Sequence, residues 1–129
     1  MHPNDRQYCQ EHTWAKLEGS IAICGITKYA EEMLNDVVYS DLPRVGKQCE
    51  QAKACGILES IKSVSDVYSP LSGEVVEVND DVVSDPAFVN KDPMGAGWLF
   101  KLKPSNLDEV KNLLDAEAYE KFLKDAAQD

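Results

Sequence analysis

The sequence predicts a mainly β protein, built as a sandwich or flattened barrel with short helices and a helix at its C-terminal end. Short apolar runs of strand character, separated by turn residues, occupy most of the chain. Two runs, NDVVYSDL from Asn35 and GEVVEVND from Gly73, share an acid-Val-Val core after a turn residue, as two halves related by a pseudo-twofold axis would. After Ser105 the apolar residues instead recur at helical spacing.

Apolar alternation and turn residues mark the expected strands. They cover residues 14–17, 20–24, 36–39, 56–61, 64–68, 73–78 and 98–103. The first two runs flank Glu18-Gly19, which suits a tight hairpin turn. In the last run, Trp98, Phe100 and Leu102 are expected to share one face by strict alternation.

Two segments are expected to be helical. Thr27 should cap a short helix over residues 28–34, where apolar side chains fall on one side. A longer amphipathic helix is expected from Ser105, its capping residue, to Leu123. Proline and glycine punctuate residues 84–97, which we therefore expect to form a loop.

Composition limits the classes of function. The length predicts a single domain over residues 1–129. With 23 acidic against 13 basic residues, the net charge of -10 disfavours nucleic acid and anionic membrane surfaces, and favours basic patches on other proteins. No apolar run is long enough to cross a bilayer, and no leader is recognised. The expected location is the cytoplasm, or the mitochondrial matrix if the protein is eukaryotic and already processed.

No catalytic constellation and no metal site is assigned. The cysteines lack zinc-site spacings and a secretory context, so we expect half-buried structural thiols at positions 9, 24, 49 and 55. His2 and His12 have no partner at ligand or triad spacing, and there is no phosphate loop or serine elbow. This pattern favours a carrier or binding module over an enzyme.

One lysine, Lys62, lies between two of the predicted strands. Apolar residues precede and follow it, and serines and Asp66 surround it, as suits a hairpin tip in water. From the residues alone, a lysine at such a tip is an ordinary solvated charge.

Four ordered blocks give this lysine another interpretation. They are YCQEHTWAKLEGSIAICGIT, LPRVG, GILESIKSVSDVYSPLSGEVVEVN and VNKDPMGAGWLFKLK. These blocks resemble the H protein of the glycine cleavage system, and the resemblance extends over residues 8–123. The resemblance implies a lipoyl-domain fold of two small sheets, a barrel-sandwich hybrid. It also implies that Lys62 is the lipoyl-bearing lysine, with lipoate joined to it as an amide. A biotin carrier would flank its lysine with methionines, and Ile61 and Ser63 are not methionines.

The same resemblance implies a carrier without catalytic activity, acting as a shared substrate of several enzymes. Glycine decarboxylase (P protein) would load an aminomethyl group onto the arm, aminomethyltransferase (T protein) would unload it, and dihydrolipoamide dehydrogenase (L protein) would reoxidise the dithiol. A lipoate ligase or a lipoyl/octanoyl transferase would attach the cofactor. A carrier that visits several enzymes is expected to be a monomer that binds transiently.

In the family the loaded arm folds into a cleft, for which Asp66, Glu11, His12 and Thr13 are the candidates. His12 is expected to be a hydrogen-bonding structural residue rather than a base. Two departures stand out: EHTW replaces the common EHEW, and Asn35 replaces a usual glycine, although asparagine tolerates a positive φ. They leave open an H-like protein that donates lipoyl groups to other complexes, and an unmodified interaction module.

Overall fold

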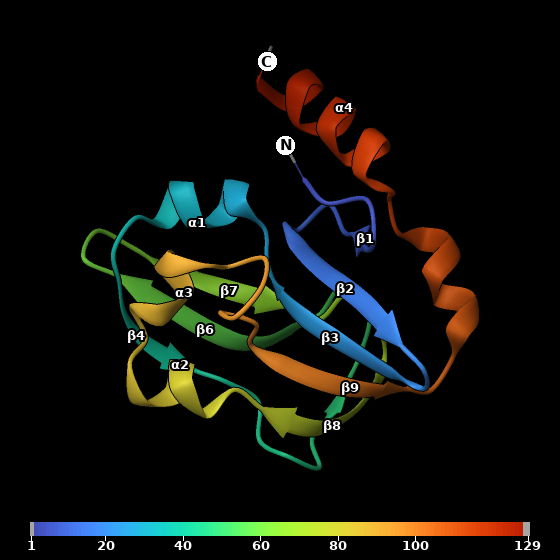
Figure 1. Cartoon of the computed structure of the whole chain (residues 1–129), viewed down its shortest axis with the longest axis horizontal. Helices are drawn as coiled ribbons and strands as arrows, with labels where there is room; N and C mark the ends of the chain where they lie inside the picture. The colour runs from blue at the N-terminus through green and yellow to red at the C-terminus, as the bar shows by residue number, and fades with distance from the viewer. Residues whose placement is uncertain (1, 128–129) are drawn as a thin grey trace.

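The computed structural model describes residues 2–127. The elements, in chain order, are β1 (Gln7–Tyr8), β2 (Thr13–Glu18), β3 (Ile21–Ile26), α1 (Lys28–Leu34), β4 (Val37–Asp41), β5 (Gln48–Cys49), β6 (Ala54–Ser60), β7 (Val64–Tyr68), β8 (Gly73–Val78), α2 (Asp80–Ser84), α3 (Phe88–Lys91), β9 (Phe100–Pro104), the 3-10 helix η1 (Leu107–Asn112) and α4 (Ala116–Ala127). Figure 1 shows their arrangement.

Two antiparallel sheets enclose the main core (Figure 1). The larger sheet has the order β1-β2-β3-β9-β8-β5, and the smaller has the order β4-β6-β7. Both sheets contribute to one apolar cluster, for example through Val75 and Leu102 from the larger and Leu58 and Val67 from the smaller. The predicted mainly β fold of two sheets with short helices and a C-terminal helix is confirmed.

The two runs that share the acid-Val-Val core lie in different sheets, and their strands are irregular at the same position. β4 has a register irregularity between Val37 and Tyr39, and β8 has one between Val75 and Glu77, which is the same step of the shared pattern. Val37 and Val75 are buried, whereas the residues that follow them are 55% and 38% exposed. A bulge bends its strand and increases its twist. The repeated pattern therefore encodes the same bend twice.

The first hairpin and the first helix largely match expectation. β2 and β3 pair from Glu18↔Ile21, so the turn is Gly19-Ser20, one residue later than predicted. Gly19 has a φ of 63°, which glycine adopts without a steric cost. Thr27 caps α1 as predicted, because its side-chain oxygen accepts a hydrogen bond from the N–H of Ala30 at 3.2 Å.

Two predictions about loop and helix in the C-terminal third were wrong. Residues 84–97 are not all loop, because α3 lies within them. The predicted helix from Ser105 is two pieces, η1 and α4, whose caps are Asn106 and Asp115 rather than Ser105. Leu114 interrupts the helix because it exchanges two backbone hydrogen bonds of 2.7 Å with Tyr8, which requires an extended chain.

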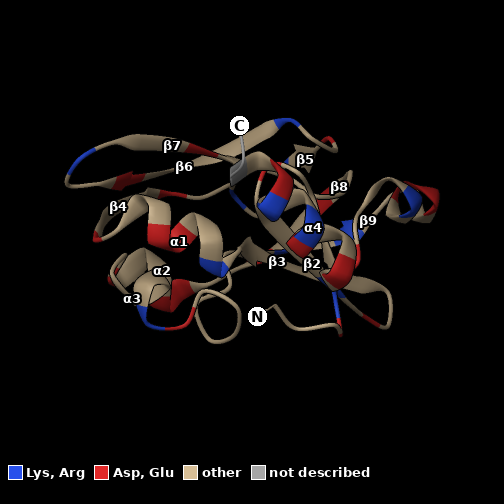
Figure 2. Cartoon of the chain, turned by 90° about the horizontal axis from the view of Figure 1, so that it is seen from above, with Lys and Arg blue, Asp and Glu red and all other residues tan. Residues whose placement is uncertain are grey.

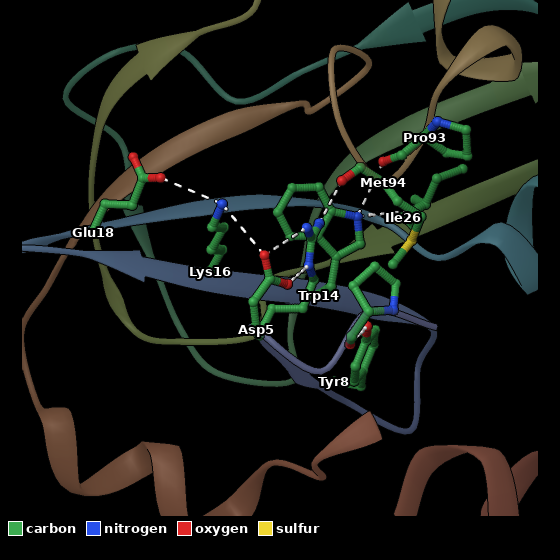
Figure 3. A network of polar contacts seen from close by, with 10 residues as sticks. Asp5, Tyr8, Trp14, Lys16, Glu18, Ile26, Pro93 and Met94 are labelled. Atoms are coloured by element: carbon green, nitrogen blue, oxygen red, sulfur yellow. Dashed lines mark hydrogen bonds and ion pairs between the residues drawn. The ribbon is translucent and has the colours of Figure 1, made fainter. Parts of the chain in front are cut away.

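A second apolar cluster lies between the larger sheet and α4. It joins Tyr8, Trp14 and Tyr119, with Trp98 packed against it. Trp98 therefore does not share a face with Phe100 and Leu102, which belong to the main core. The prediction of strict alternation from Trp98 was wrong because β9 begins only at Phe100. Figure 3 shows Trp14 with the polar contacts around it.

Candidate functional site

Lys62 lies at the tip of the hairpin that joins β6 to β7, as predicted. The strands pair up to Glu59↔Val64, and the N–H of Ser60 donates to the carbonyl of Ser63 at 2.8 Å. The turn beyond this bond contains Ile61 and Lys62, and Lys62 is exposed. Figure 2 shows the β6–β7 turn projecting from the small sheet, with basic residues (blue) at its tip. The amino group of Lys62 is thus open to an approaching enzyme.

The backbone at the tip is held from both sides. The N–H of Ser63 donates to Oγ of Ser60 at 3.1 Å, which closes the turn a second time. The N–H of Ile61 donates to the carbonyl of Asp36 at 3.3 Å and ties the tip to the segment before β4. A rigid root with an exposed side chain is what a swinging covalent arm requires.

A cleft of about 340 Å³ begins beside this tip. It lies between β7, the segment that precedes β2, and α1. The predicted residues Glu11, His12, Thr13 and Asp66 all line it, and Ser63, the neighbour of Lys62, lines it too. The fold therefore brings together side chains that are far apart in sequence and places them next to the lysine.

Backbone groups also face this cleft. β7 is an edge strand of the smaller sheet. Ser60 and Ser63 form a hydrogen-bonded pair, and antiparallel pairs alternate, so the N–H and C=O groups of Val64 and Asp66 point away from β6. Both residues line the cleft. The cleft thus combines backbone groups of an edge strand, where the Asp66 carbonyl accepts a hydrogen bond from Oγ of Ser65 at 3.3 Å, with the side chains of Tyr29 and Met33 from α1.

His12 has its hydrogen-bond partner in the C-terminal helix. Its Nδ1 lies 2.8 Å from the hydroxyl oxygen of Tyr119, and its ring packs at 4.7 Å on Tyr29. Burial lowers the pKa of His12, although the Glu11 carboxylate opposes this effect. The imidazole is therefore neutral near pH 7. Tyr119 lies 107 positions later, so no local sequence signal could have identified it.

The remaining predicted cleft residues differ in exposure. Thr13 is only 2% exposed, and its hydroxyl lies 2.6 Å from the thiol of Cys9, so it is part of the wall rather than a free polar group. Glu11 and Asp66 are exposed and carry the charge. Within the described residues, no Lys or Arg lines the cleft, so it favours a cation over an anion.

The thiols differ from the expectation in burial. Cys9, Cys24, Cys49 and Cys55 are free and all buried, rather than half-buried. Hydrogen bonding from Cys55 lowers the pKa of Cys49 to about 7, and the same contact raises the pKa of Cys55. Over residues 2–127 no cluster of three or more His, Cys, Asp or Glu side chains could hold a metal ion.

Comparison with known proteins identifies the family. A family model described as "Glycine cleavage H-protein" matches residues 6–126. The chain belongs to the glycine cleavage H-protein family. The glycine cleavage system H protein of Symbiobacterium thermophilum is 50% identical over 123 residues, covering 95% of this chain and 96% of that protein. The H protein of Thermus thermophilus is 46% identical over 125 residues, covering 97% and 98%.

A solved structure supports the same assignment. A glycine cleavage system H protein from Mycobacterium marinum superposes with a TM-score of 0.84 at 41% identity, covering 92% of this chain and 96% of that one. The protein is therefore a lipoyl carrier of the glycine cleavage system, with the lipoyl-domain-like fold predicted above, and is not itself catalytic. A separate lipoyl-relay role is not favoured. No helix within residues 2–127 is long and apolar enough to span a membrane.

Proposed function

We propose that Lys62 is the residue that carries lipoate, in amide linkage to its Nζ, and that the adjoining cleft shelters the loaded arm. The observation that carries this proposal is the position of an exposed lysine on a braced turn directly beside a cleft with two carboxylates. When bound, lipoate supplies a dithiolane whose sulfur can accept and release the aminomethyl group of glycine.

The residues present fit such an arm. Asp66 lies in β7, two positions beyond its first residue Val64, which is about 7 Å along a strand at a rise of about 3.3 Å per residue. A lysine side chain extended by a lipoyl chain is long enough to run from the turn past this stretch of the cleft. The amine at its end would thus lie near Asp66 and Glu11, while its methylene groups would lie against Tyr29 and Met33. The carboxylates would hold the ammonium group, and the apolar walls would exclude water.

The partners follow from this role. The carrier would present its arm to glycine decarboxylase (P protein), then to aminomethyltransferase (T protein) and to dihydrolipoamide dehydrogenase (L protein), as a substrate shared by all of them. A lipoate ligase or a lipoyl/octanoyl transferase would load Lys62. Transient docking by a monomer of one domain suits this sequence of visits, and the bacterial relatives named above support a cytoplasmic setting.

The proposal is tested by enzymatic lipoylation. The full chain is incubated with lipoate, ATP and a lipoate ligase, and intact mass and peptide mapping locate the product. We expect one lipoyl adduct, on Lys62, absent from Lys62→Arg and present in Lys53→Arg, a control at another exposed lysine. An adduct elsewhere, or none on the folded wild-type protein, contradicts the assignment. The loaded protein should then support glycine-bicarbonate exchange with a compatible glycine decarboxylase.

A further inference from the structure

The hydroxyl of Tyr119 occupies a position between two cleft elements. Its oxygen lies 2.8 Å from Oγ1 of Thr27 and 2.8 Å from Nδ1 of His12. Thr27 is the cap of α1 and accepts a hydrogen bond from Ala30. Thr27 and Tyr119 are both 0% exposed, so water does not compete for these contacts. One hydroxyl of α4 thus connects the start of α1 to the histidine in the cleft wall.

The direction of these hydrogen bonds follows from donor and acceptor counts. Thr27 has a buried hydroxyl proton, and Tyr119 is its one side-chain partner that can accept it within the described residues. If Thr27 donates to Tyr119, the proton of Tyr119 is free for Nδ1 of His12. If Nδ1–H instead donated to Tyr119, either the Thr27 proton or the Tyr119 proton would be left without an acceptor among the described residues, which is costly in a buried site.

This order determines where the neutral His12 ring carries its proton. Nδ1 accepts from Tyr119, so the proton is on Nε2. Burial raises the pKa of Tyr119, which keeps its hydroxyl protonated as the chain requires. Nε2 has no hydrogen-bond partner within residues 2–127 and is not enclosed. Because His12 lines the cleft, this N–H is available to an occupant.

We propose that Tyr119 is a positioning residue that holds His12 as the Nε2–H tautomer, and that this N–H binds the amide carbonyl of the lipoyl-lysine arm. The contact to the arm rests on the proposed function; the tautomer does not. The amide carbonyl is the acceptor that the arm offers, whereas its ammonium group can only donate. The cleft would therefore use its carboxylates for the amine and His12 for the amide.

The surroundings of His12 are consistent with a neutral donor. The titratable groups that face it are Glu11 from its own segment, Tyr29 from α1, Tyr119 from α4 and Asp66 across the cleft. The Glu11 carboxylate favours the protonated ring, whereas burial opposes it and has the larger effect on the pKa of His12.

The tautomer is tested by nitrogen-15 NMR of the histidine rings in the full chain, without any cofactor. Loss of a signal in His12→Gln assigns the ring. We expect Nδ1 of His12 to be unprotonated and Nε2 to be protonated in the wild type. Tyr119→Phe keeps the aromatic packing but should give mixed tautomers, whereas Tyr39→Phe, at an exposed tyrosine of β4, should not change the spectrum. A proton on Nδ1 in the wild type overturns the assignment.

The contact to the arm is tested by the loss of the aminomethyl group from the loaded, lipoylated protein. His12→Asn tolerates the positive φ of 69° and can keep a contact with Tyr119, but lacks a donor at the Nε2 position. We expect the His12→Asn and Tyr119→Phe proteins to lose the aminomethyl group about three- to tenfold faster than wild type. His12→Gln, whose amide reaches further, should retain part of the protection.

The outcomes separate the two claims. Decay of the His12→Asn protein at the wild-type rate, with the tautomer confirmed, overturns the contact to the arm and leaves the proposed function intact. Wild-type protein that takes no lipoate overturns the proposed function together with that contact, and the NMR result still decides the role of Tyr119.

Discussion

The indole ring of Trp14 lies directly against Gly25, its cross-strand partner in the β2–β3 pair. The indole N–H donates to the carbonyls of Ile26 at 2.9 Å and Pro93 at 3.1 Å (Figure 3). The guanidinium of Arg6 lies 4.5 Å from the ring centre on top of it. The ring thus fixes the strand ends from which the cleft residues project, because Thr13 and Ile26 are the adjacent positions in each strand.

Gly25→Ala is expected to destabilise the protein. A Cβ at this position would lie 2.8 Å from Cζ2 of Trp14, so the ring or the strand must move. Overpacking of this kind costs about 1–3 kcal/mol of unfolding free energy. Urea denaturation measures the change, with Ser20→Ala in the neighbouring turn as a control expected within about 0.5 kcal/mol. Equal stability of Gly25→Ala and wild type would show that the ring relaxes freely.

Asn35 should be replaceable by glycine with a gain in stability. It ends α1 with φ 63° and ψ -140°, a region that residues other than glycine adopt only at a cost. Asn35→Gly is expected to raise the free energy of unfolding by about 1 kcal/mol, and Asn35→Ala to lower it. Thermal and urea denaturation of the two variants measures whether each one raises or lowers the free energy of unfolding. The same sign for both variants would contradict the strain argument.

Asp66→Asn should weaken protection of the loaded arm. The variant preserves shape but removes one of the two carboxylates that line the cleft and would face the cation, so we expect the aminomethyl group to be lost about three- to tenfold faster. Asp41→Asn is the matched control, since Asp41 is exposed on the same small sheet and does not line this cleft. The rate at which the aminomethyl group is lost is measured on the lipoylated wild type and both variants. Equal rates for all three proteins would contradict a role of the cleft in protecting the arm.

Stability should fall in acid partly through His12. Its pKa is lowered in the folded state from the usual 6.5, so the unfolded chain binds the proton first as the pH falls. The stability contributed by the neutral ring is complete above pH 6.5 and is lost as the pH falls through the lowered pKa. Denaturation between neutral pH and about pH 5 should show a steeper loss in wild type than in His12→Gln. Parallel curves would contradict the shift.

Local patterns predicted the parts of the fold that depend on local geometry. The β6–β7 turn and the Thr27 cap follow from residue types that favour those conformations, and asparagine at position 35 tolerates the positive φ found there. The split between η1 and α4 was not predictable, because helical spacing continues through Leu114 while a distant partner, Tyr8, holds that residue extended. Tertiary contacts here override a weak local preference.

The candidate site also has a part that local sequence predicts and a part that only the fold reveals. The exposed hairpin tip that carries Lys62 was predictable from the residues around it, whereas only the family resemblance suggested a role for the lysine. The carboxylates of Glu11 and Asp66 were named from that resemblance, and only the fold shows that they share a cleft. The bond from His12 to Tyr119 joins opposite ends of the chain, and neither residue type signals the other.

The start of the described chain lies against the C-terminal helix, and this arrangement affects how the protein can be handled. The backbone N–H of His2 donates to the Glu120 carboxylate at 3.0 Å, which fastens the N-terminal segment to α4. In Figure 1 both lie away from the β6–β7 turn. A surface-immobilised or fluorescently labelled carrier can therefore be attached through either end with Lys62 facing outward, so that successive enzyme visits can be followed on a single molecule.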